Sequence, residues 1–407
     1  MFGHLLTQLS SEVETVRKAL TISERLRDLL TQHRTVLAAL SAEQNRSADE
    51  ASLVVREVSA MLAETPDKLD WQIYDHCAAL TRLYSAYERF VGDLVDEYVD
   101  LLPELYKTYD ELPSAVTIQH RVGIAQILLK IGDRGPYKQL TEHALVGELA
   151  AGLSGASGYK LMSDAFFIDR QNLRFEVLVR LFSTLGFEKA GRYINRHQAV
   201  LTFIRSERAD SSSTQKELEA FIDYRNEAAH RKVENVIAID AIAGIGRFVV
   251  ALGSAIADLV EEAVLQRRME LGDYDIILAI TEIHHDGRVV IGVPNTGVAL
   301  ETGADVVVFG ERTCYRARIE SLQLNGNPTQ AMTGDGATEV GIRLSKKAPT
   351  GGELRTLRIP TKTPAAEQLV LDQIPLAEVE TADTDIAETG GVDVSEATDS
   401  EEQATAG

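Results

Sequence analysis

The segment FVVALGSAIA, residues 248–257, is the most apolar part of the chain, and the charged residues Arg247 and Asp258 stand at its two ends. Ten residues rise about 15 Å in an α-helix, which is half of the ~30 Å hydrocarbon core of a bilayer. The segment is therefore too short to cross a membrane. We interpret it as the middle of a buried helix that extends over about residues 236–271.

The sequence that precedes this helix predicts further helices almost throughout. Leu9, Val13, Val16 and Leu20 recur at intervals of three and four residues, which places them on one face of a helix. Proline cannot continue a helix normally, so Pro103 is expected to end a long one. The expected helices cover residues 49–62, 69–102, 170–185, 187–208, 214–232 and 236–271, and two more begin at Pro113 and Pro136.

After Gly272 the pattern changes to short runs rich in β-branched residues. Turn signals such as Asp286-Gly287 and Asn325-Gly326 separate these runs. Several short strands in so few residues predict a small closed β-barrel. The expected strands cover residues 275–283, 288–293, 305–309, 315–324, 337–344 and 353–359.

The last 47 residues, 361–407, hold 12 acidic residues, one basic residue and no aromatic residue. Such a segment cannot bury enough apolar area to offset the entropy of ordering, so we predict a disordered acidic tail. The tail carries −11 of the net charge of −21. A negative chain argues against tight non-specific binding to nucleic acid, which depends on Lys and Arg, but it leaves room for a local basic site.

The expected fold class is therefore mainly α, with a helical bundle followed by a small β-barrel and the tail. The two cysteines, Cys77 and Cys314, fall in different expected domains, which excludes a disulfide scaffold and suits a reducing compartment. No signal-peptide pattern begins the sequence, so we expect a soluble cytoplasmic protein that does not contact membranes. The expected domains are a helical extension (1–65), a helical domain (66–271), the barrel (272–360) and the tail (361–407).

The sharpest local signal is the segment YRNEAAHRK, residues 224–232, near the end of a predicted helix. The imidazole of His230 can accept or donate a proton near neutral pH, and the planar fork of Arg225 suits a phosphate. Together they suit metal-free RNA cleavage. In this interpretation His230 deprotonates a ribose 2′-hydroxyl or protonates the leaving oxygen, while Arg225 stabilises the phosphorane charge.

The spacing leaves alternatives open. Residues five apart lie about 140° apart around a helix, whereas Asn226 and His230 share a face. Either Arg225 leans across, or the helix is distorted, or a second copy of the chain completes the site. A structural explanation also exists, since cations such as His230, Arg231 and Lys232 are favoured at a helix C-terminus by ~0.3–1 kcal/mol.

The string Arg225-Asn226-x-x-x-His230 resembles the R-x(4–6)-H signature of the HEPN superfamily. The segments 71–91, with Glu88 beside an aromatic residue, and 172–187 resemble helices of its RiboL-PSP-type, defence-associated, ribonuclease-like branch. The resemblance covers about residues 69–271. It implies an all-α bundle that forms homodimers and brings two motifs together in one cleft.

The resemblance further implies a metal-independent endoribonuclease of a toxin or phage-defence system, with no cofactor and no metal. Arg225 and His230 would be the catalytic pair, Asn226 a supporting polar residue and Glu88 an orienting residue, and Arg231 and Lys232 would contact RNA. The expected partners are RNA (tRNA or rRNA), a second copy of the chain, and a neutralising or defence-system protein. The alternative is a non-catalytic dimeric scaffold or a protein that senses nucleotides or RNA.

The predicted barrel is similar to the second domain of translation-factor GTPases, although no G-x(4)-G-K-[ST] motif occurs in the chain. Barrels of this kind can contact tRNA or rRNA, so Arg316 and Arg318 become candidate RNA-binding residues. Acidic residues outnumber basic ones between 270 and 360, which favours the alternative of a docking or oligomerisation module.

Overall fold

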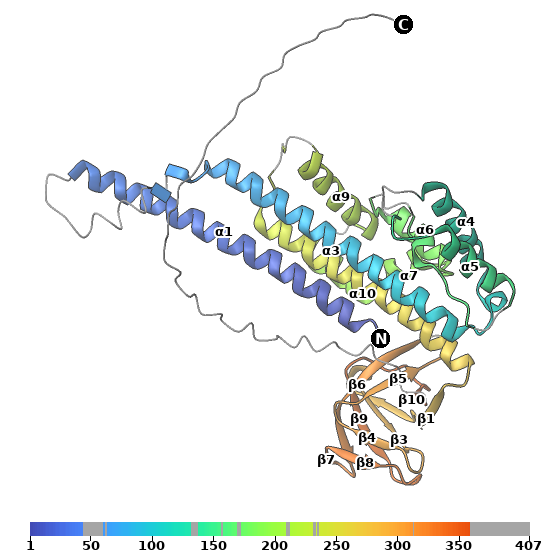
Figure 1. The fold of residues 1–407 in the computed structure, drawn as a ribbon. Helices are drawn as coiled ribbons and strands as arrows, with labels where there is room; N and C mark the ends of the chain where they lie inside the picture. Colours follow the sequence, from blue (N-terminus) through green and yellow to red (C-terminus); the bar gives the residue numbers. More distant parts are fainter. Residues whose placement is uncertain are drawn as a thin grey trace, which may run out of the picture. The chain divides into compact units, whose positions relative to one another are not determined.

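The computed structural model, shown in Figure 1, describes most of the chain up to residue 358. The predicted acidic tail lies outside the described residues, and so does almost all of the predicted helix at 49–62. The described residues are 1–43, 60–61, 63–131, 137–155, 158–168, 172–208, 212–230, 233, 236–311 and 313–358.

Three long helices form the centre of the helical part: α1 (Gly3–Glu43), α3 (Lys68–Leu105) and α10 (Ile239–Glu270). Figure 1 shows them side by side over much of their length. The predicted buried helix is thus confirmed as α10, in which Leu252 and Ile256 are fully buried. The N-terminal helix shares the same hydrophobic core, because Leu9, Val16 and Leu20 of α1 are buried against α3 and α10.

A glycine sets the close approach of these three helices. A Cβ atom at Gly253 of α10 would lie 2.7 Å from Cδ2 of Leu9 on α1 and 3.3 Å from the ring of Phe90 on α3. Any larger residue would push both neighbours away. The glycine within the apolar segment therefore has a packing role, which the segment's hydrophobicity alone does not reveal.

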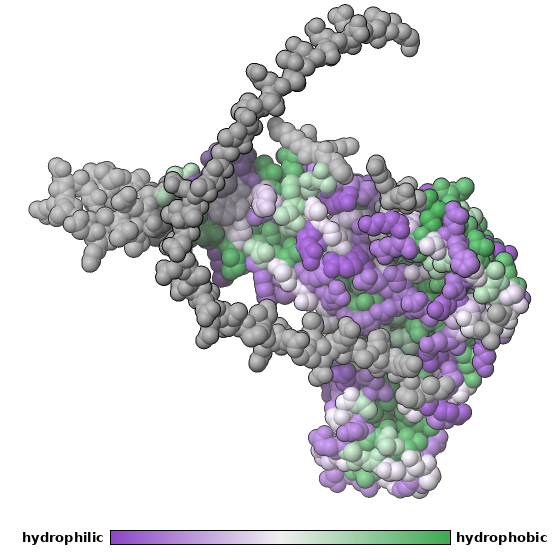
Figure 2. All heavy atoms as spheres, in the orientation of Figure 1, coloured by the Kyte–Doolittle hydropathy of each residue, from purple (hydrophilic) through white to green (hydrophobic). Residues whose placement is uncertain are grey.

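Shorter helices cover one side of this centre. Figure 2 shows hydrophobic residues at the edge formed by α4 and α5, where Ile118, Val122 and Leu129 are exposed. The shorter helices are α4 (Ser114–Lys130), α5 (Glu142–Leu153), α6 (Phe175–Thr184), α7 (Ala190–Arg196), α8 (Gln198–Glu207) and α9 (Thr214–His230).

Several helix boundaries differ from the prediction, and the helices expected to begin at Pro136 and at residue 170 begin instead at Glu142 (α5) and Phe175 (α6). The helix expected to end at Pro103 continues to Leu105, because a proline in the last turn removes only one N–H and the N–H of Tyr106 still donates to the carbonyl of Leu102 (2.8 Å). The single helix expected over 187–208 is instead α7 and α8. His197 between them is extended (φ −66°, ψ 135°), and its side chain bonds to Asp258 of α10 (3.1 Å).

The described strands pair in an antiparallel manner and form a module of two sheets. The larger sheet has the order β1-β10-β5-β6-β9-β3-β2, with β7 paired to β6, and β4 pairs with β8. The strands are β1 (Tyr274–Ala279), β2 (Glu282–His284), β3 (Val289–Gly292), β4 (Ala299–Glu301), β5 (Asp305–Phe309), β6 (Cys314–Leu324), β7 (Asn327–Thr329), β8 (Ala331–Thr333), β9 (Val340–Leu344) and β10 (Glu353–Leu357).

The expected barrel is present, but it contains more strands than predicted. The first predicted strand is two strands, β1 and β2, and the three-residue strands β4, β7 and β8 were not predicted. The Asn325-Gly326 hairpin is confirmed, since both residues have positive φ (51° and 80°), as a type I′ turn requires. The sheet closes by isolated hydrogen bonds, such as Asn295 N–H to the carbonyl of Ile277 (2.8 Å), and encloses a separate apolar core.

The barrel is attached to the end of α10. Leu265 of α10 packs in one apolar cluster with Tyr274 of β1, Phe309 of β5 and Cys314 of β6. The thiol of Cys314 donates to the carbonyl of Glu262 on α10 (3.3 Å). Burial raises the pKa of this thiol to about 12, so Cys314 is a protonated, packed side chain at neutral pH.

Candidate active site

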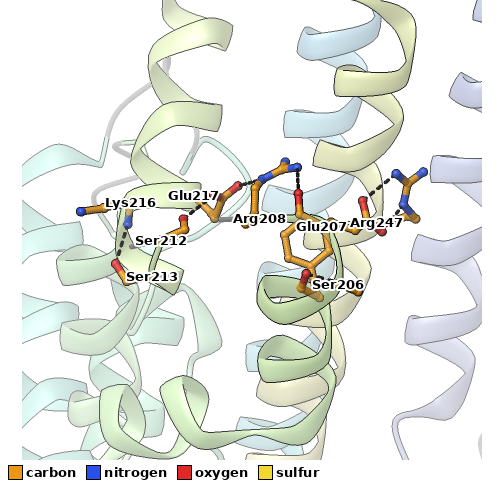
Figure 3. Close-up of polar contacts among 9 residues, drawn as sticks. Ser206, Glu207, Arg208, Ser212, Ser213, Lys216, Glu217 and Arg247 are labelled. Atoms are coloured by element: carbon orange, nitrogen blue, oxygen red, sulfur yellow. Dashed lines mark hydrogen bonds and ion pairs between the residues drawn. The ribbon is translucent and has the colours of Figure 1, made fainter. Parts of the chain in front are cut away.

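The helix that carries the motif, α9, is fixed at its start by a polar network, which Figure 3 shows. Arg208, just after α8, donates to Glu217 in the first turn of α9 (2.7 Å). Glu207 accepts two hydrogen bonds from Arg247 of α10 (both 2.6 Å). The hydroxyl of Ser213 accepts from the N–H of Lys216 (3.3 Å), so Ser213 caps the start of this helix.

The middle of α9 is held by apolar packing against α3. Leu218, Phe221 and Ile222 are fully buried. The ring of Phe221 lies 6.1 Å from that of Tyr84 and 6.4 Å from that of Tyr87, both on α3. Arg225 comes one turn after Phe221, so this packing brings its side chain to the same face of α3.

Arg225 is half-buried and stacks on Tyr84, with its guanidinium carbon 4.3 Å from the ring centre. Its Nη1 donates to the side-chain oxygens of Asn172 (3.2 Å) and Asn226 (3.0 Å). Its Nε is buried and has no hydrogen-bond partner among the described residues, and none of them forms an ion pair with it. A partly buried cation without a counterion attracts negative charge, so an anion at this point would be stabilised.

Tyr84 also fixes the loop that supplies Asn172. Its hydroxyl accepts from the N–H of Leu173 (3.1 Å), while the hydroxyl of Tyr87 donates to the carbonyl of the same residue (3.2 Å). Burial raises the pKa of both tyrosines, and the charge of Glu88 raises it further. Tyr84 and Tyr87 are therefore buried core residues.

Sequence reasoning did not assign Tyr84 and Asn172 to the site. Asn172 lies more than fifty residues before Arg225, and Tyr84 more than one hundred. No local sequence pattern around Tyr84 relates it to Arg225. Only the packing of α9 on α3 shows that its ring also supports the motif arginine.

The other predicted motif residues are placed only in part. Asn226 is in direct contact with Arg225. Glu88 lies one turn after Tyr84 on α3 and is half-buried. His230 is the last residue of α9, but its side chain lies outside the described residues, as do Arg231 and Lys232. Since α9 is helical through to His230, the helix distortion considered above is not found between Arg225 and His230.

A histidine on α3, His76, lies close enough to the motif segment to interact electrostatically with Glu227. His76 is 1% exposed, and neither ring nitrogen has a hydrogen-bond partner among the described residues. Burial lowers the pKa of His76, although the charge of Glu227 on α9 opposes this effect. His76 is therefore a buried, neutral side chain that interacts electrostatically with Glu227 of the motif segment.

The two predicted RNA-binding residues of the barrel already have acidic partners. Arg316 is half-buried and pairs with Glu261 of α10, with Nε 2.9 Å from Oε1 at an angle unsuited to a hydrogen bond. Arg318 is exposed and donates to Asp305 on the neighbouring strand (3.2 Å). Arg316 thus joins the barrel to the helices, and it does not form a free basic strip with Arg318.

Two kinds of feature are absent from the described residues. No group of three or more His, Cys, Asp or Glu side chains in this part of the chain is placed to hold a metal ion. None of its helices combines the length and the apolar character needed to span a membrane.

Comparison with known proteins gives one match. No curated protein and no solved structure matches the chain. The family model described as RiboL-PSP-HEPN matches residues 49–262, which is more than half of the chain and includes α3, the Asn172 loop and α9. The chain therefore belongs to the HEPN superfamily, in its RiboL-PSP family.

Proposed function

We propose that the protein is a metal-independent endoribonuclease that cleaves RNA by attack of a ribose 2′-hydroxyl, with Arg225 and His230 as the catalytic pair. The proposal rests on the contacts of the Arg225 guanidinium and on its lack of a counterion among the described residues. Tyr84 and two amide oxygens hold its guanidinium in place, while no carboxylate among the described residues neutralises it. Membership of the HEPN superfamily supports the same assignment.

In the reaction, the 2′-oxygen attacks the adjacent phosphorus and the bond from phosphorus to the 5′-oxygen breaks. The products are a 2′,3′-cyclic phosphate and a free 5′-hydroxyl. His230 either accepts the proton of the 2′-hydroxyl or donates one to the leaving 5′-oxygen. Arg225 stabilises the extra negative charge on the phosphorane through its unused N–H groups.

The two residues lie about 140° apart around α9, so we propose that a homodimer completes the site. In that arrangement the motifs of two chains face one cleft. Asn226 helps to hold Arg225, to which its oxygen already bonds. Glu88 orients the same region through its charge near Tyr84. We further propose that the protein acts in a toxin or phage-defence system, with a neutralising partner protein.

A second candidate function also has an observation in its favour. Arg225 connects α3, α9 and the Asn172 loop, so it can serve as a structural tether in a non-catalytic scaffold. Arg225→Lys separates the two functions. Lysine keeps the charge but loses the planar fork, so catalysis should be strongly reduced even in a variant whose thermal unfolding shows that the fold is retained.

The test uses the purified full-length chain with bulk cellular RNA in EDTA, followed by analysis of the RNA ends. We expect cyclic-phosphate ends with the natural sequence and their loss in Arg225→Lys, Arg225→Ala and His230→Ala. Arg25→Ala is the matched control, because Arg25 is exposed on α1 and has no ion pair among the described residues. Intact RNA with the natural sequence, or equal cleavage by all variants, contradicts the proposal.

A further inference from the structure

A second basic region lies where α7, α8 and α10 face the barrel, and it contains neither Arg225 nor Asn226. This groove has a volume of about 1240 Å³, more than the ~300–1,000 Å³ of most small-molecule pockets. Both parts of the chain supply basic side chains to it. These are Lys189, Arg192 and Arg196 from the helical part and Arg288, Lys346 and Lys347 from the barrel.

The acidic residues of the groove are already engaged. Asp258 accepts from His197 (3.1 Å) and lies 3.6 Å from Nζ of Lys346. Glu261 pairs with Arg316 (2.9 Å) and with the N-terminal amine (2.6 Å). Their negative charge is therefore neutralised in contacts that hold the helices and the barrel together.

The third acidic residue, Glu262, is held in a different way. Its carboxyl bonds to Tyr193 and to the backbone of Cys314. Burial raises the pKa of Glu262, and the charge of Asp258 adds to this effect. Glu262 thus faces Tyr193 and the barrel, and it does not pair with a basic side chain of the groove.

Most of the basic side chains, in contrast, have no acidic partner. Lys189, Arg192, Arg196, Arg288 and Lys347 are all exposed, and no ion pair joins them to any carboxylate in the described part of the chain. This excess of positive charge occurs in a chain whose net charge is −21. A concave surface of one sign concentrates the field and attracts a ligand of the opposite sign.

Aromatic rings accompany these charges. The ring of Tyr193 stacks on that of His197 (centres 5.9 Å apart, planes at 26°). Nζ of Lys346 lies 5.8 Å from the ring centre of Tyr315 on β6. Both tyrosines are half-buried in the groove wall. A basic groove combined with aromatic faces is how proteins bind single-stranded nucleic acid without sequence preference.

We propose that this groove binds the phosphate backbone of a single-stranded segment of the RNA substrate, at a site separate from the catalytic motif. The inference rests on the proposed function for the identity of the substrate, and on the unpaired lysines and arginines for the binding. The barrel then contributes half of a substrate-binding surface, and β6 joins it to α10 through Arg316 and Cys314.

The two sites lie at different levels along α10. Gly246 of α10 packs against Leu83, the neighbour of Tyr84, whereas Asp258 lines the groove. Twelve residues of helix correspond to roughly 18 Å. At about 3.4 Å per nucleotide in a stacked strand, an RNA that reaches both levels needs at least about five nucleotides between them.

The experiment measures binding of a fluorescein-labelled oligouridine of about 20 nucleotides to the full-length chain by fluorescence anisotropy. All proteins carry His230→Ala, so the RNA stays intact. The test variant is Lys189→Glu/Lys347→Glu, with one change on each side of the groove. The matched control is Lys138→Glu/Lys160→Glu, which changes the charge equally at two exposed lysines outside the groove.

We expect the groove variant to bind RNA about 20-fold more weakly at ~0.1 M salt, with a log–log salt slope smaller by about 1.4, since each phosphate contact on a single strand contributes about 0.7. The control should change affinity by less than about 3-fold. Equal weakening in both variants, or unchanged RNA binding in the groove variant, overturns the proposal. The proposal is also overturned if the groove variant loses binding to poly-glutamate but still binds RNA.

The outcome also separates this inference from the proposed function. If the natural sequence cleaves no RNA but the groove variant loses binding, the groove stands and the nuclease proposal fails. If RNA is cleaved with cyclic-phosphate ends and the groove variant without His230→Ala binds and cleaves normally, the nuclease stands and the groove proposal fails.

Discussion

The end of α9 and the groove at the barrel are both basic, but they hold their charge in opposite ways. Arg225 is a single half-buried guanidinium, fixed by an aromatic ring and two amides. The groove has several exposed lysines and arginines with long, flexible side chains. Its carboxylates Glu261 and Asp258 already form ion pairs with Arg316 and Lys346. A fixed charge suits stabilisation of one transition state, whereas mobile charges suit tolerant binding along a strand. The comparison therefore predicts that catalysis and affinity can be changed separately.

The largest expected effect is on catalysis at the end of α9. His230→Ala should lower the cleavage rate by about 10²- to 10⁴-fold, which is the usual contribution of a general acid or base. RNA affinity should change by less than about 3-fold, because the groove is intact. Single-turnover cleavage and anisotropy, measured on the same preparation, give the two numbers. A parallel loss of rate and affinity would mean that the two regions are one site.

The next largest effect is expected when Tyr84, on which Arg225 stacks, is changed. Tyr84→Phe keeps the ring beneath the guanidinium but leaves the buried N–H of Leu173 without its acceptor, so we expect a loss of about 1–3 kcal/mol of unfolding free energy with cleavage retained. Tyr84→Leu also removes the ring and should reduce cleavage. Urea denaturation and the cleavage assay measure these effects.

Tyr87→Phe is the matched control for this prediction. It removes a hydroxyl that donates to the carbonyl of Leu173, and a carbonyl that loses one partner is tolerated better than an N–H that loses its only one. Its stability loss should be smaller than that of Tyr84→Phe. If Tyr84→Leu cleaves RNA at the natural rate, the ring does not position Arg225 for catalysis.

A smaller effect tests whether both halves of the groove contribute. Lys189→Glu on the helical side and Lys347→Glu on the barrel side should each weaken RNA binding about 5-fold at ~0.1 M salt, as expected for one phosphate contact. Lys160→Glu should have little effect. An effect of Lys189→Glu alone would remove the barrel from the binding surface, and the comparison would then concern the helical part only.

The smallest effect is expected at Asp258, the groove carboxylate that contacts His197 and Lys346. Burial acts to raise the pKa of Asp258, but the hydrogen bond from His197 and the charge of Lys346 outweigh it, so this pKa is lowered. Ionised Asp258 should stabilise the fold above the unfolded-state pKa of about 3.9 and lose this effect as the pH falls through its folded-state pKa. Because the group is partly exposed, we expect at most about 1 kcal/mol.

Asp258→Asn should therefore lower the unfolding free energy at pH 7, and the difference from the natural sequence should vanish near pH 2. Asp305→Asn, which removes an exposed ion pair with Arg318, is the control and should change little at either pH. A difference that persists unchanged at low pH would show that Asp258 acts through packing and not through its charge.

Sequence reasoning was most successful where the pattern is local. The buried helix around residues 248–257, the change to strands after Gly272 and the Asn325-Gly326 hairpin follow from periodicity and turn chemistry, and the structure confirms them. The HEPN resemblance is confirmed by the family match. The break at His197 was not predictable, because the side chain that stabilises it, Asp258, lies far along the chain on α10.

The sequence was enough to predict the helix that carries Arg225, Asn226 and His230, because helical and strand periods are properties of neighbouring residues. Tertiary structure alone decided what surrounds them. Tyr84 and Asn172 meet Arg225 only when α3, α9 and the loop before α6 pack together. The basic groove likewise exists only because the barrel, whose local composition is acidic, adds Lys347 to the groove that Lys189 lines from the helical side. Charge acts through space, so its distribution depends on which distant segments the fold places side by side.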